Sequence, residues 1–380
     1  MSAIKQSDAV VIGAGIIGAS TAYYLSKAGV DVTLIDSKGN NASSTASTAT
    51  AGGVRHQGRI PAEIPFALYA IKLWTGLEEE VSTDLHYRQD GMTVLTDDEA
   101  LIPGLEERVA KEQSLGLDIK MVYGPEMHEL IPGLSPLMLA GSYCPLDGHA
   151  DPMRTTNALV EAAKGLGAHI EWHCPAENLV AEGNRIVAVR TSKCNIHCQH
   201  VVLAAGAWSK PIAATVGVSL PIQPVGLQMM VTSRRPHALD QVLAWVGHGI
   251  SLKQVPSGGF VIGGGWPGHG DPATYQTSLN PGSMAKSAQT TVGLFPSLAD
   301  VPVIRAWVGI EAFCVDELEI LGPVPGLEGL IMATGFSGHG FALGPGVGSL
   351  IADYVTAGKW PEMVRPFSIT RFGKNNQEDI

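Results

Sequence analysis

The stretch 8–36, DAVVIGAGIIGASTAYYLSKAGVDVTLID, decides the fold. Its first apolar run has the composition of a buried parallel strand, and Gly13, Gly15 and Gly18 follow it at the GxGxxG spacing. The next residues keep a helical period, and a second apolar run, VDVTLID, ends at Asp36. This order of strand, glycine turn, helix and strand predicts the first βαβ unit of a Rossmann-like α/β fold.

Each position of this motif has a physical role in binding a dinucleotide. Gly13 permits the tight turn, Gly15 lets a pyrophosphate approach the backbone, and Gly18 lets the helix pack on the strand. The helix N-terminus offers free N–H groups and a positive dipole end to the phosphates, and Asp36 can accept hydrogen bonds from a ribose. A structural βαβ unit without a ligand is the alternative, and the motif alone does not choose between NAD and FAD.

A second glycine-rich stretch, GFSGHGFALGPGVG at 335–348, leads into the apolar helical pattern SLIADYVTAG. Reduced flavin carries negative charge at N1 and the adjacent carbonyl, and a helix N-terminus aimed there would stabilise that charge. Gly338 and Gly340 would let the backbone touch the flavin ring. The pair of glycine motifs therefore favours FAD over NAD, although a packing loop capped by glycines is the alternative for the second motif.

Two further segments fit a flavin protein. The small-residue loop SSTASTATAGGVRHQ at 43–57 offers Ala51, Gly52 and Gly53 for close backbone approach to the flavin end. The apolar run HVVLAAGAWS at 200–209 reads as a buried strand that ends in small residues, where it could pass under the cofactor.

The composition restricts the class of protein. The 380 residues carry a net charge of −11, and 45% of them are hydrophobic. This balance is typical of a globular protein, and the acidity argues against a nucleic-acid partner, whose phosphates need a basic face. The apolar runs are short and broken, so we expect no integral membrane segment. Residues 1–13 pass almost directly into a strand, which predicts no signal peptide and a cytoplasmic protein.

The cysteines give no disulfide framework, because an odd and sparse set in a large chain is typical of reduced thiols. The stretch KCNIHC places Cys194 and Cys198 near His197, but the spacing is not a standard zinc pairing. We expect a hairpin there and no metal site. The five cysteines are Cys144, Cys174, Cys194, Cys198 and Cys314.

Taken together, the motifs GAGIIG, TAGGVR, VVLAAGAWS, GGFVIGGG and GFSGHGF resemble the FAD-dependent amine oxidoreductases that include D-amino-acid oxidase, glycine oxidase and sarcosine oxidase. Within that family, RAWVGIEAFCVDELEILGPVPG, SGHGFALGPGVG and PFSITRF look most like the catalytic beta subunits of heteromeric opine, hydroxyproline and proline dehydrogenases. The resemblance implies a Rossmann-like FAD-binding domain with an inserted α+β substrate domain, whose sheet is antiparallel or mixed.

We expect the FAD-binding domain to be discontinuous, with residues 1–82, 145–225 and 322–380. The substrate domain then consists of residues 83–144 and 226–321, and the second of these pieces contains β-runs separated by turn signals. Substrate would bind between the two domains, where pockets are common.

The motifs and the resemblance together imply a set of residues in contact with FAD. The expected residues are Gly13, Gly15, Ile16, Ile17, Gly18, Asp36, Ser37, Lys38, Ala46, Ser47, Ala51, Gly52, Gly53, Ala176, Ala205, Gly206, Trp208, Gly309, Phe336, Ser337, Gly338, His339, Gly340, Phe341 and Ala342.

Departures from the family pattern concern the cofactor and the electron acceptor. The cysteine that binds flavin covalently in monomeric sarcosine oxidases matches Gly309, so we expect non-covalent FAD. The lysine that helps oxygen accept electrons matches Val261, and its absence favours transfer to partner subunits. A second flavin is anchored near His149 in heterotetrameric sarcosine oxidases, but the matching position here is nearer Ala150. FMN or an iron–sulfur centre at the interface or in partner subunits stays possible.

The substrate side departs further. The arginine that holds the carboxylate in D-amino-acid and glycine oxidases matches Glu311, so Arg55 becomes the first candidate for that role and Arg59 the second. Glu311 could meet a cationic amine or form a structural ion pair. His56 and His339 are candidate acid–base residues, although His339 could simply shape the flavin loop.

These observations predict an FAD-dependent dehydrogenase that oxidises the C–N bond of a secondary-amine amino acid, such as an opine, hydroxyproline, proline or a sarcosine-like compound. The Cα–H would leave as hydride to flavin N5, and electrons would pass to partner subunits. One alternative is a self-sufficient amine or D-amino-acid oxidase that produces hydrogen peroxide. Another is a flavin-holding electron-relay subunit without turnover of its own.

Overall fold

The computed structural model describes residues 5–39 and 44–373. Its central sheet has the order β21–β22–β13–β2–β3–β9, and every neighbouring pair except β21–β22 is parallel. This sheet confirms the Rossmann-like α/β prediction. Its strands are β2 (Ala9–Ile12), β3 (Val32–Ile35), β9 (His169–Glu171), β13 (His200–Leu203), β21 (Ile320–Pro323) and β22 (Leu330–Thr334).

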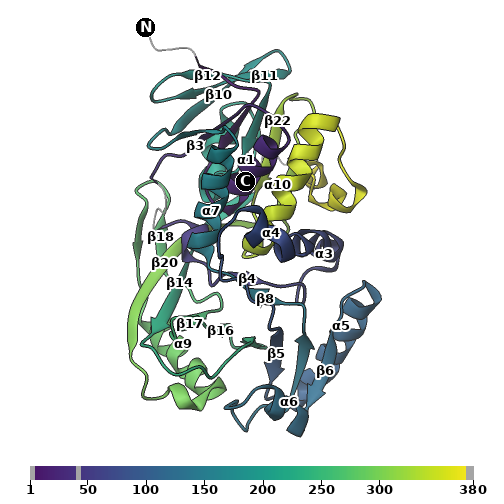
Figure 1. Ribbon diagram of the computed structural model, residues 1–380, viewed down its shortest axis with the longest axis vertical. Helices are drawn as coiled ribbons and strands as arrows, with labels where there is room; N and C mark the ends of the chain where they lie inside the picture. Colours follow the sequence, from purple (N-terminus) through teal and green to yellow (C-terminus); the bar gives the residue numbers. More distant parts are fainter. Residues whose placement is uncertain (1–4, 40–43, 374–380) are drawn as a thin grey trace.

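Three helices pack together on this sheet: α1 (Ile16–Lys27) contacts α7 (Pro152–Gly165) and α10 (Gly340–Ala357) (Figure 1). The glycines allow backbones to touch. A Cβ on Gly18 would lie 1.7 Å from the Gly13 carbonyl oxygen, and one on Gly348 would lie 2.5 Å from the Ser20 carbonyl. The second glycine run is therefore also a helix-packing surface. The alternative interpretation of this run, a loop whose glycines allow packing, describes part of its role.

The second sheet has eight strands in the order β20–β14–β17–β16–β15–β5–β7–β6. It is mixed, because β15 and β5 are parallel whereas the other neighbours are antiparallel. Its strands are β5 (Met92–Thr96), β6 (Lys120–Tyr123), β7 (Ala140–Cys144), β14 (Ile222–Thr232), β15 (Val242–Trp245), β16 (Ile250–Gln254), β17 (Phe260–Gly263) and β20 (Val303–Cys314).

The two faces of the eight-stranded sheet differ in what they contact. Along β15, Leu243 and Trp245 belong to a core cluster with α9 (Pro281–Leu294), whereas Val242 and Ala244 line a large cavity. This alternation follows from the two-residue period of a strand. The sheet therefore supplies one wall of the cavity, and its other face is covered by helix.

The other elements complete the two layers. The stretch KCNIHC forms the expected hairpin, since β12 pairs antiparallel with β11. The remaining strands are β1 (Lys5–Gln6), β4 (Gly53–Val54), β8 (Gly148–His149), β10 (Ala176–Glu182), β11 (Arg185–Thr191), β12 (Asn195–His197), β18 (His269–Asp271) and β19 (Gln276–Ser278). The remaining helices are α2 (Ala46–Ala49), α3 (Ile64–Lys72), α4 (Trp74–Glu80), α5 (Ile102–Ser114), α6 (Gly124–Leu130), α8 (Ser209–Ala214) and α9, with short 3-10 turns between them.

The parallel sheet draws its strands from 9–35, 169–203 and 320–334, and the eight-stranded sheet from 92–144 and 222–314. The division into two discontinuous domains, whose ends include residues outside the described part of the chain, stays a prediction. Within the described residues, no helix has the length and apolarity needed to cross a membrane.

The contact at Gly18 gives a stability prediction. Gly18→Ala should destabilise the protein by about 1–3 kcal/mol or more, because the added methyl group overlaps the Gly13 carbonyl. Gly76→Ala is the matched control: Gly76 lies inside α4 with open space around it, so its replacement should be neutral or stabilising by roughly 0.5–1 kcal/mol. Thermal unfolding measures both. Equal Tm values for Gly18→Ala and the wild type would contradict the packing.

Candidate active site

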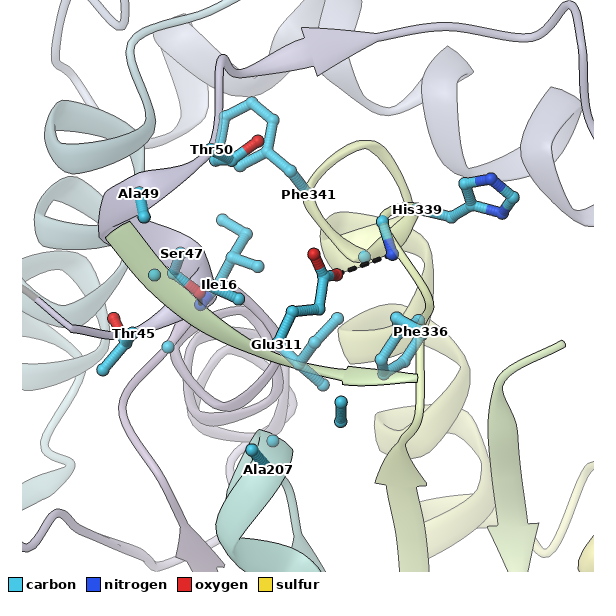
Figure 2. A pocket seen from close by; sticks show the side chains of 18 of the residues that line it. Ile16, Thr45, Ser47, Ala49, Thr50, Ala207, Glu311, Phe336, His339 and Phe341 are labelled. Atoms are coloured by element: carbon cyan, nitrogen blue, oxygen red, sulfur yellow. Dashed lines mark hydrogen bonds between the residues drawn. The ribbon is translucent and has the colours of Figure 1, made fainter. Parts of the chain in front are cut away.

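A cavity of about 780 Å³ runs between the parallel sheet and the eight-stranded sheet. Its size falls in the range of cofactor and ligand sites. Both glycine motifs reach it, and Figure 2 shows side chains from both converging on the same space. The predicted residues that line it are Gly13, Gly15, Ile16, Ile17, Asp36, Ser37, Ala46, Ser47, Ala51, Gly53, Arg55, Ala176, Ala205, Gly206, Trp208, Gly309, Glu311, Phe336, Ser337, Gly338, His339, Gly340 and Phe341.

Besides Arg59, five predicted residues do not line this cavity. Gly18 packs on Gly13, and Lys38 places its amine 4.1 Å above the ring of Tyr275. Each of the five packs against the protein or takes part in a local contact. A match to a sequence motif cannot distinguish such a role from contact with a cofactor. These five residues are Gly18, Lys38, Gly52, His56 and Ala342.

The first motif presents an open helix N-terminus to the cavity. Helix α1 has no acidic residue in its first turn, and the Ile16 N–H donates to Ser47 Oγ at 2.9 Å. The Asp36 carboxylate accepts from the Ala14 N–H and the Lys38 N–H, both at 2.8 Å, at the end of β3. Burial raises the pKa of Asp36. Free N–H groups at a helix start beside a fixed carboxylate suit a pyrophosphate and a ribose.

The second motif forms a tight loop before α10. Ser337 and Gly338 both have positive φ, 50° and 91°, and the Ser337 hydroxyl accepts from the Cys314 N–H at 3.0 Å. Helix α10 begins at Gly340 without a side-chain cap and without an acidic residue in its first turn. Its N-terminus is therefore free to face an electron-rich group in the cavity.

Glu311 projects from β20 into this region. Its carboxylate accepts a 2.6 Å hydrogen bond from the Gly338 N–H, as Figure 2 shows. Burial raises the pKa of Glu311 to about 7, and the Gly338 hydrogen bond opposes that rise. The structural ion pair considered for Glu311 is not found among the described residues. An acid that titrates near neutral pH can pair with a cationic amine or take its proton.

The two arginines of the flavin loop differ in their partners. Arg59 is buried and bonds Glu63 at 2.8 Å, so its guanidinium has a structural role and does not line the cavity. Arg55 lines the cavity and, among the described residues, donates to the carbonyls of Gln57 and Gly58 alone, at 2.6 and 3.0 Å. Burial lowers the pKa of Arg55 to about 10. Its guanidinium is therefore available to an anionic ligand.

The two candidate histidines are held by carboxylates away from the cavity centre. The His339 ring bonds Glu63 at 3.0 Å and points away from Glu311 in Figure 2, and burial lowers its pKa to about 4. The His56 ring bonds Asp147 at 2.8 Å. Both rings are therefore held by carboxylates, and of the two only His339 lines the cavity among the described residues; an acid–base role for either histidine stays a prediction.

His56, Asp147 and Cys144 are the one group of three potential metal ligands found in the described chain. Burial raises the pKa of the Cys144 thiol well above its usual range, which opposes the thiolate that a metal requires. The group is therefore best described as a buried hydrogen-bonded cluster behind the loop that carries Arg55.

An aromatic pair closes one end of the cavity, and sequence reasoning found only half of it. The Tyr275 ring, from the β18–β19 hairpin, stacks on Trp208 with centroids 4.7 Å apart, and its hydroxyl bonds Ser37 at 2.9 Å. Tyr275 has a φ of 60°, and Trp208 donates to the Pro272 carbonyl at 2.7 Å. No sequence pattern predicted that an insertion would reach back to the residues beside Asp36.

A buried lysine lies opposite Val261 in the eight-stranded sheet. Val261 carries no charge, but its cross-strand partner in the eight-stranded sheet is Lys253. The Lys253 amine is buried and donates to the Ala150 carbonyl at 3.1 Å, and burial lowers its pKa to about 7. Directly paired residues project from the same face of a sheet, so an ionisable side chain leaves this face next to the uncharged Val261.

The structure also shows the surroundings of the positions that matter for covalent flavin attachment and for a second flavin. Gly309 lines the cavity, and a Cβ there would lie 2.2 Å from the Ala49 Cβ. His149 and Ala150 are both buried. Neither of them offers an exposed side chain for a flavin at an interface.

Comparison with known proteins identifies the class. The sequence model of the FAD dependent oxidoreductase (DAO) family matches residues 8–354. The chain belongs to this family. FAD is therefore its cofactor, and the prediction of an FAD-dependent oxidoreductase is confirmed. The cavity fits FAD, because it joins a dinucleotide-type helix N-terminus to a second helix N-terminus that faces the space beyond it.

Several relatives cover most of this chain. Mouse mitochondrial dimethylglycine dehydrogenase is 28% identical over 97% of the chain, but the chain spans only 44% of that protein, about half the length of the first curated relatives. The sarcosine oxidase subunit beta of Rhizobium meliloti is 25% identical, with 96% of this chain and 88% of that protein covered. The crystal structure of L-proline dehydrogenase from P. horikoshii has a TM-score of 0.90 at 28% identity and covers 97% of this chain and 98% of its own.

Loss of the Tyr275 stack should weaken FAD retention. Tyr275→Ala removes both the ring contact with Trp208 and the hydrogen bond to Ser37, and we expect the Kd for FAD to rise about tenfold. Tyr275→Phe keeps the stack and should have a smaller effect. Fluorescence of released FAD during dilution measures both variants. An unchanged Kd in Tyr275→Ala would show that the hairpin does not hold the cofactor.

The raised pKa of Glu311 gives a pH dependence of stability. Between about pH 4.5 and 7 the folded protein without FAD binds more protons than the unfolded chain, so its stability falls as pH rises through this window. Glu311→Gln removes the buried charge and should raise the Tm at pH 8 by roughly 2–4 °C. The difference should vanish below pH 4.5.

The matched control for this pH experiment is Glu107→Gln, an exposed residue on α5. A wild-type protein with the same Tm as Glu311→Gln at pH 8 would contradict a buried, charge-penalised Glu311.

Proposed function

We propose that this chain oxidises the C–N bond of a secondary-amine amino acid, such as an opine, a proline derivative or a sarcosine-like compound. One observation carries the proposal: a half-buried acid, Glu311, and a guanidinium without a carboxylate partner among the described residues, Arg55, line the same cavity. An amino acid carries a cationic amine and an anionic carboxylate, and this pair of groups complements both charges.

The relatives support this substrate class. Dimethylglycine, sarcosine and L-proline, which appear in the names of three relatives, all carry an alkyl group on the amine nitrogen. Glu311 would hydrogen-bond the amine and, with a pKa of about 7, accept its proton at neutral pH. Arg55 would grip the carboxylate and orient the Cα–H.

Bound FAD supplies the two-electron acceptor that takes the hydride from the substrate carbon. The chain's residues would supply orientation and electrostatics: the N-terminus of α10 would stabilise negative charge on the reduced cofactor, and the apolar side chains of the eight-stranded sheet would exclude water. The oxidised substrate is an imine, which hydrolyses to a keto acid and an amine or stays cyclic when the substrate is a ring.

We further propose that electrons pass to partner subunits. A neutral Val261 and the subunit names of relatives such as Rhizobium meliloti sarcosine oxidase subunit beta support this acceptor. A self-sufficient oxidase that forms hydrogen peroxide is the second candidate. Lys253 favours it, because a buried ammonium on the same sheet face could stabilise developing superoxide.

The test is anaerobic reduction of the FAD-loaded protein. Opines, proline derivatives, sarcosine and D-amino acids are added one at a time, and loss of flavin absorbance identifies a substrate. Readmitted air then separates the acceptors: a flavin that stays reduced for a long time in air supports partner subunits, and fast reoxidation with peroxide formation identifies an oxidase. A fully loaded protein that none of these amines reduces would contradict the proposal.

Arg55 should matter for carboxylate binding. Arg55→Ala should raise the KM of the identified substrate about 10- to 100-fold, since a charge-assisted hydrogen bond contributes roughly 1.5–3 kcal/mol. Arg190→Ala, an exposed arginine on β11, is the control and should leave the KM unchanged. An unchanged KM in Arg55→Ala would remove this residue from the site.

A further inference from the structure

The cavity reaches the surface at Gly58, which is exposed. A second guanidinium lies there. A Cβ placed on Gly58 would be 3.4 Å from Arg55 Nη1 and 3.8 Å from Arg108 Nη1. Two guanidinium nitrogens therefore lie near the space that a side chain at Gly58 would occupy. Arg55 comes from the loop after β4, and Arg108 comes from helix α5.

From this geometry we infer that Arg108 and Arg55 form a two-guanidinium site for a single carboxylate. The inference rests on the proposed function, because it assigns the carboxylate of the amino-acid substrate to this end of the cavity. No sequence pattern indicates Arg108, because it lies in an insertion far from either glycine motif and approaches Arg55 only in the folded chain.

Arg108 is held in position by a buried chain of hydrogen bonds. Its Nη2 donates to Ser142 Oγ at 2.7 Å, and Ser142 Oγ donates to Gln57 Oε1 at 2.8 Å. The Gln57 amide in turn donates to the Met92 carbonyl at 2.7 Å. Ser142 and Gln57 are fully buried. Among the described residues Arg108 Nη1 has no hydrogen-bond partner, so the network fixes one side of the guanidinium and leaves the other for a ligand.

The two guanidinium groups at this end differ in their carboxylate contacts. Glu112 accepts from the Gly58 N–H at 2.8 Å and lies 3.9 Å from Arg108 Nε, whereas Arg55 has no carboxylate partner in the described structure. Burial lowers the pKa of both arginines. Glu63 and Asp147 also act on the charge of Arg55, and Arg59 and Arg108 oppose them. A substrate carboxylate would therefore be the first direct ion-pair partner of the Arg55 guanidinium among the described residues.

The site predicts selectivity for amino acids over simple amines. Arg55 belongs to the flavin loop and Arg108 to the inserted segment, so a bound carboxylate would join the two. If Arg108 served only to hold α5 to β7, its loss would lower stability and affect every substrate equally. Binding of a carboxylate that has no amine separates these roles.

The experiment uses the FAD-loaded full chain and propionate as the probe. Propionate is titrated at neutral pH, and its Kd is read from the perturbation of the flavin spectrum. We expect Arg108→Met to raise this Kd about 10- to 100-fold and Arg108→Lys to raise it less, because an ammonium keeps the charge but loses the fork geometry. Ser142→Ala, which releases Arg108 Nη2, should raise it by a smaller factor. Lys111→Met, an exposed residue on the same helix, is the control and should leave it unchanged.

The outcomes separate this inference from the proposed function. A propionate Kd in folded, FAD-loaded Arg108→Met and Arg108→Lys equal to that of the wild type would overturn the inference, even if amino acids reduce the flavin. Arg108-dependent propionate binding in a chain that no amino-acid amine reduces would support the site while the proposed reaction fails. With an active substrate, Arg108→Met should raise the KM of the amino acid but not that of the corresponding amine without a carboxylate; an equal rise for both would also overturn it.

Discussion

The structure depends on one constraint: parallel neighbouring strands end at the same edge of a sheet. Strands β2, β13 and β22 are parallel neighbours, so the segments that follow them emerge together. Helices α1 and α10, which begin just after β2 and β22, therefore open toward one cavity although they lie at opposite ends of the chain. Glycine contacts between the two helices, such as Gly348 on the Ser20 backbone, allow the close packing that keeps their N-termini together.

The eight-stranded sheet covers this edge, and the cavity between the two sheets contains both an acidic group and guanidinium groups. Its strands alternate residues toward the helices and toward the cavity, which gives an apolar wall over the cofactor. From β20 comes Glu311, beside the N-terminus of α10, and from the loops come the guanidinium groups at Gly58. The match to the FAD-dependent family accounts for the cofactor end, whereas the acid and guanidinium groups carry the proposed specificity for amino acids.

The sequence could predict the parts that are local. The strand–glycine–helix order, the second glycine run and the small-residue loop follow from short-range rules, and most of the residues that they indicated line the cavity. Contacts that depend on strand pairing or on the packing of distant segments could not be predicted from the sequence. Lys253 lies beside Val261 only because β16 pairs with β17, and Arg108 and Tyr275 reach the cavity only through the fold of the insertions. Gly52 and Ala342 match family positions, but they contact other parts of the chain and do not line the cavity. A sequence motif shows that a position holds a small residue but not whether a cofactor or a packed neighbour requires it.

The most direct test of the account is a crystal structure of the chain with FAD. The account predicts the pyrophosphate at the N-terminus of α1 beside Gly15, and the flavin ring against the loop that contains Gly338, with the Glu311 carboxylate facing the ring. A flavin ring bound away from this loop, or an FAD whose phosphates lie elsewhere than at α1, would contradict the claim that the two glycine motifs serve one cofactor.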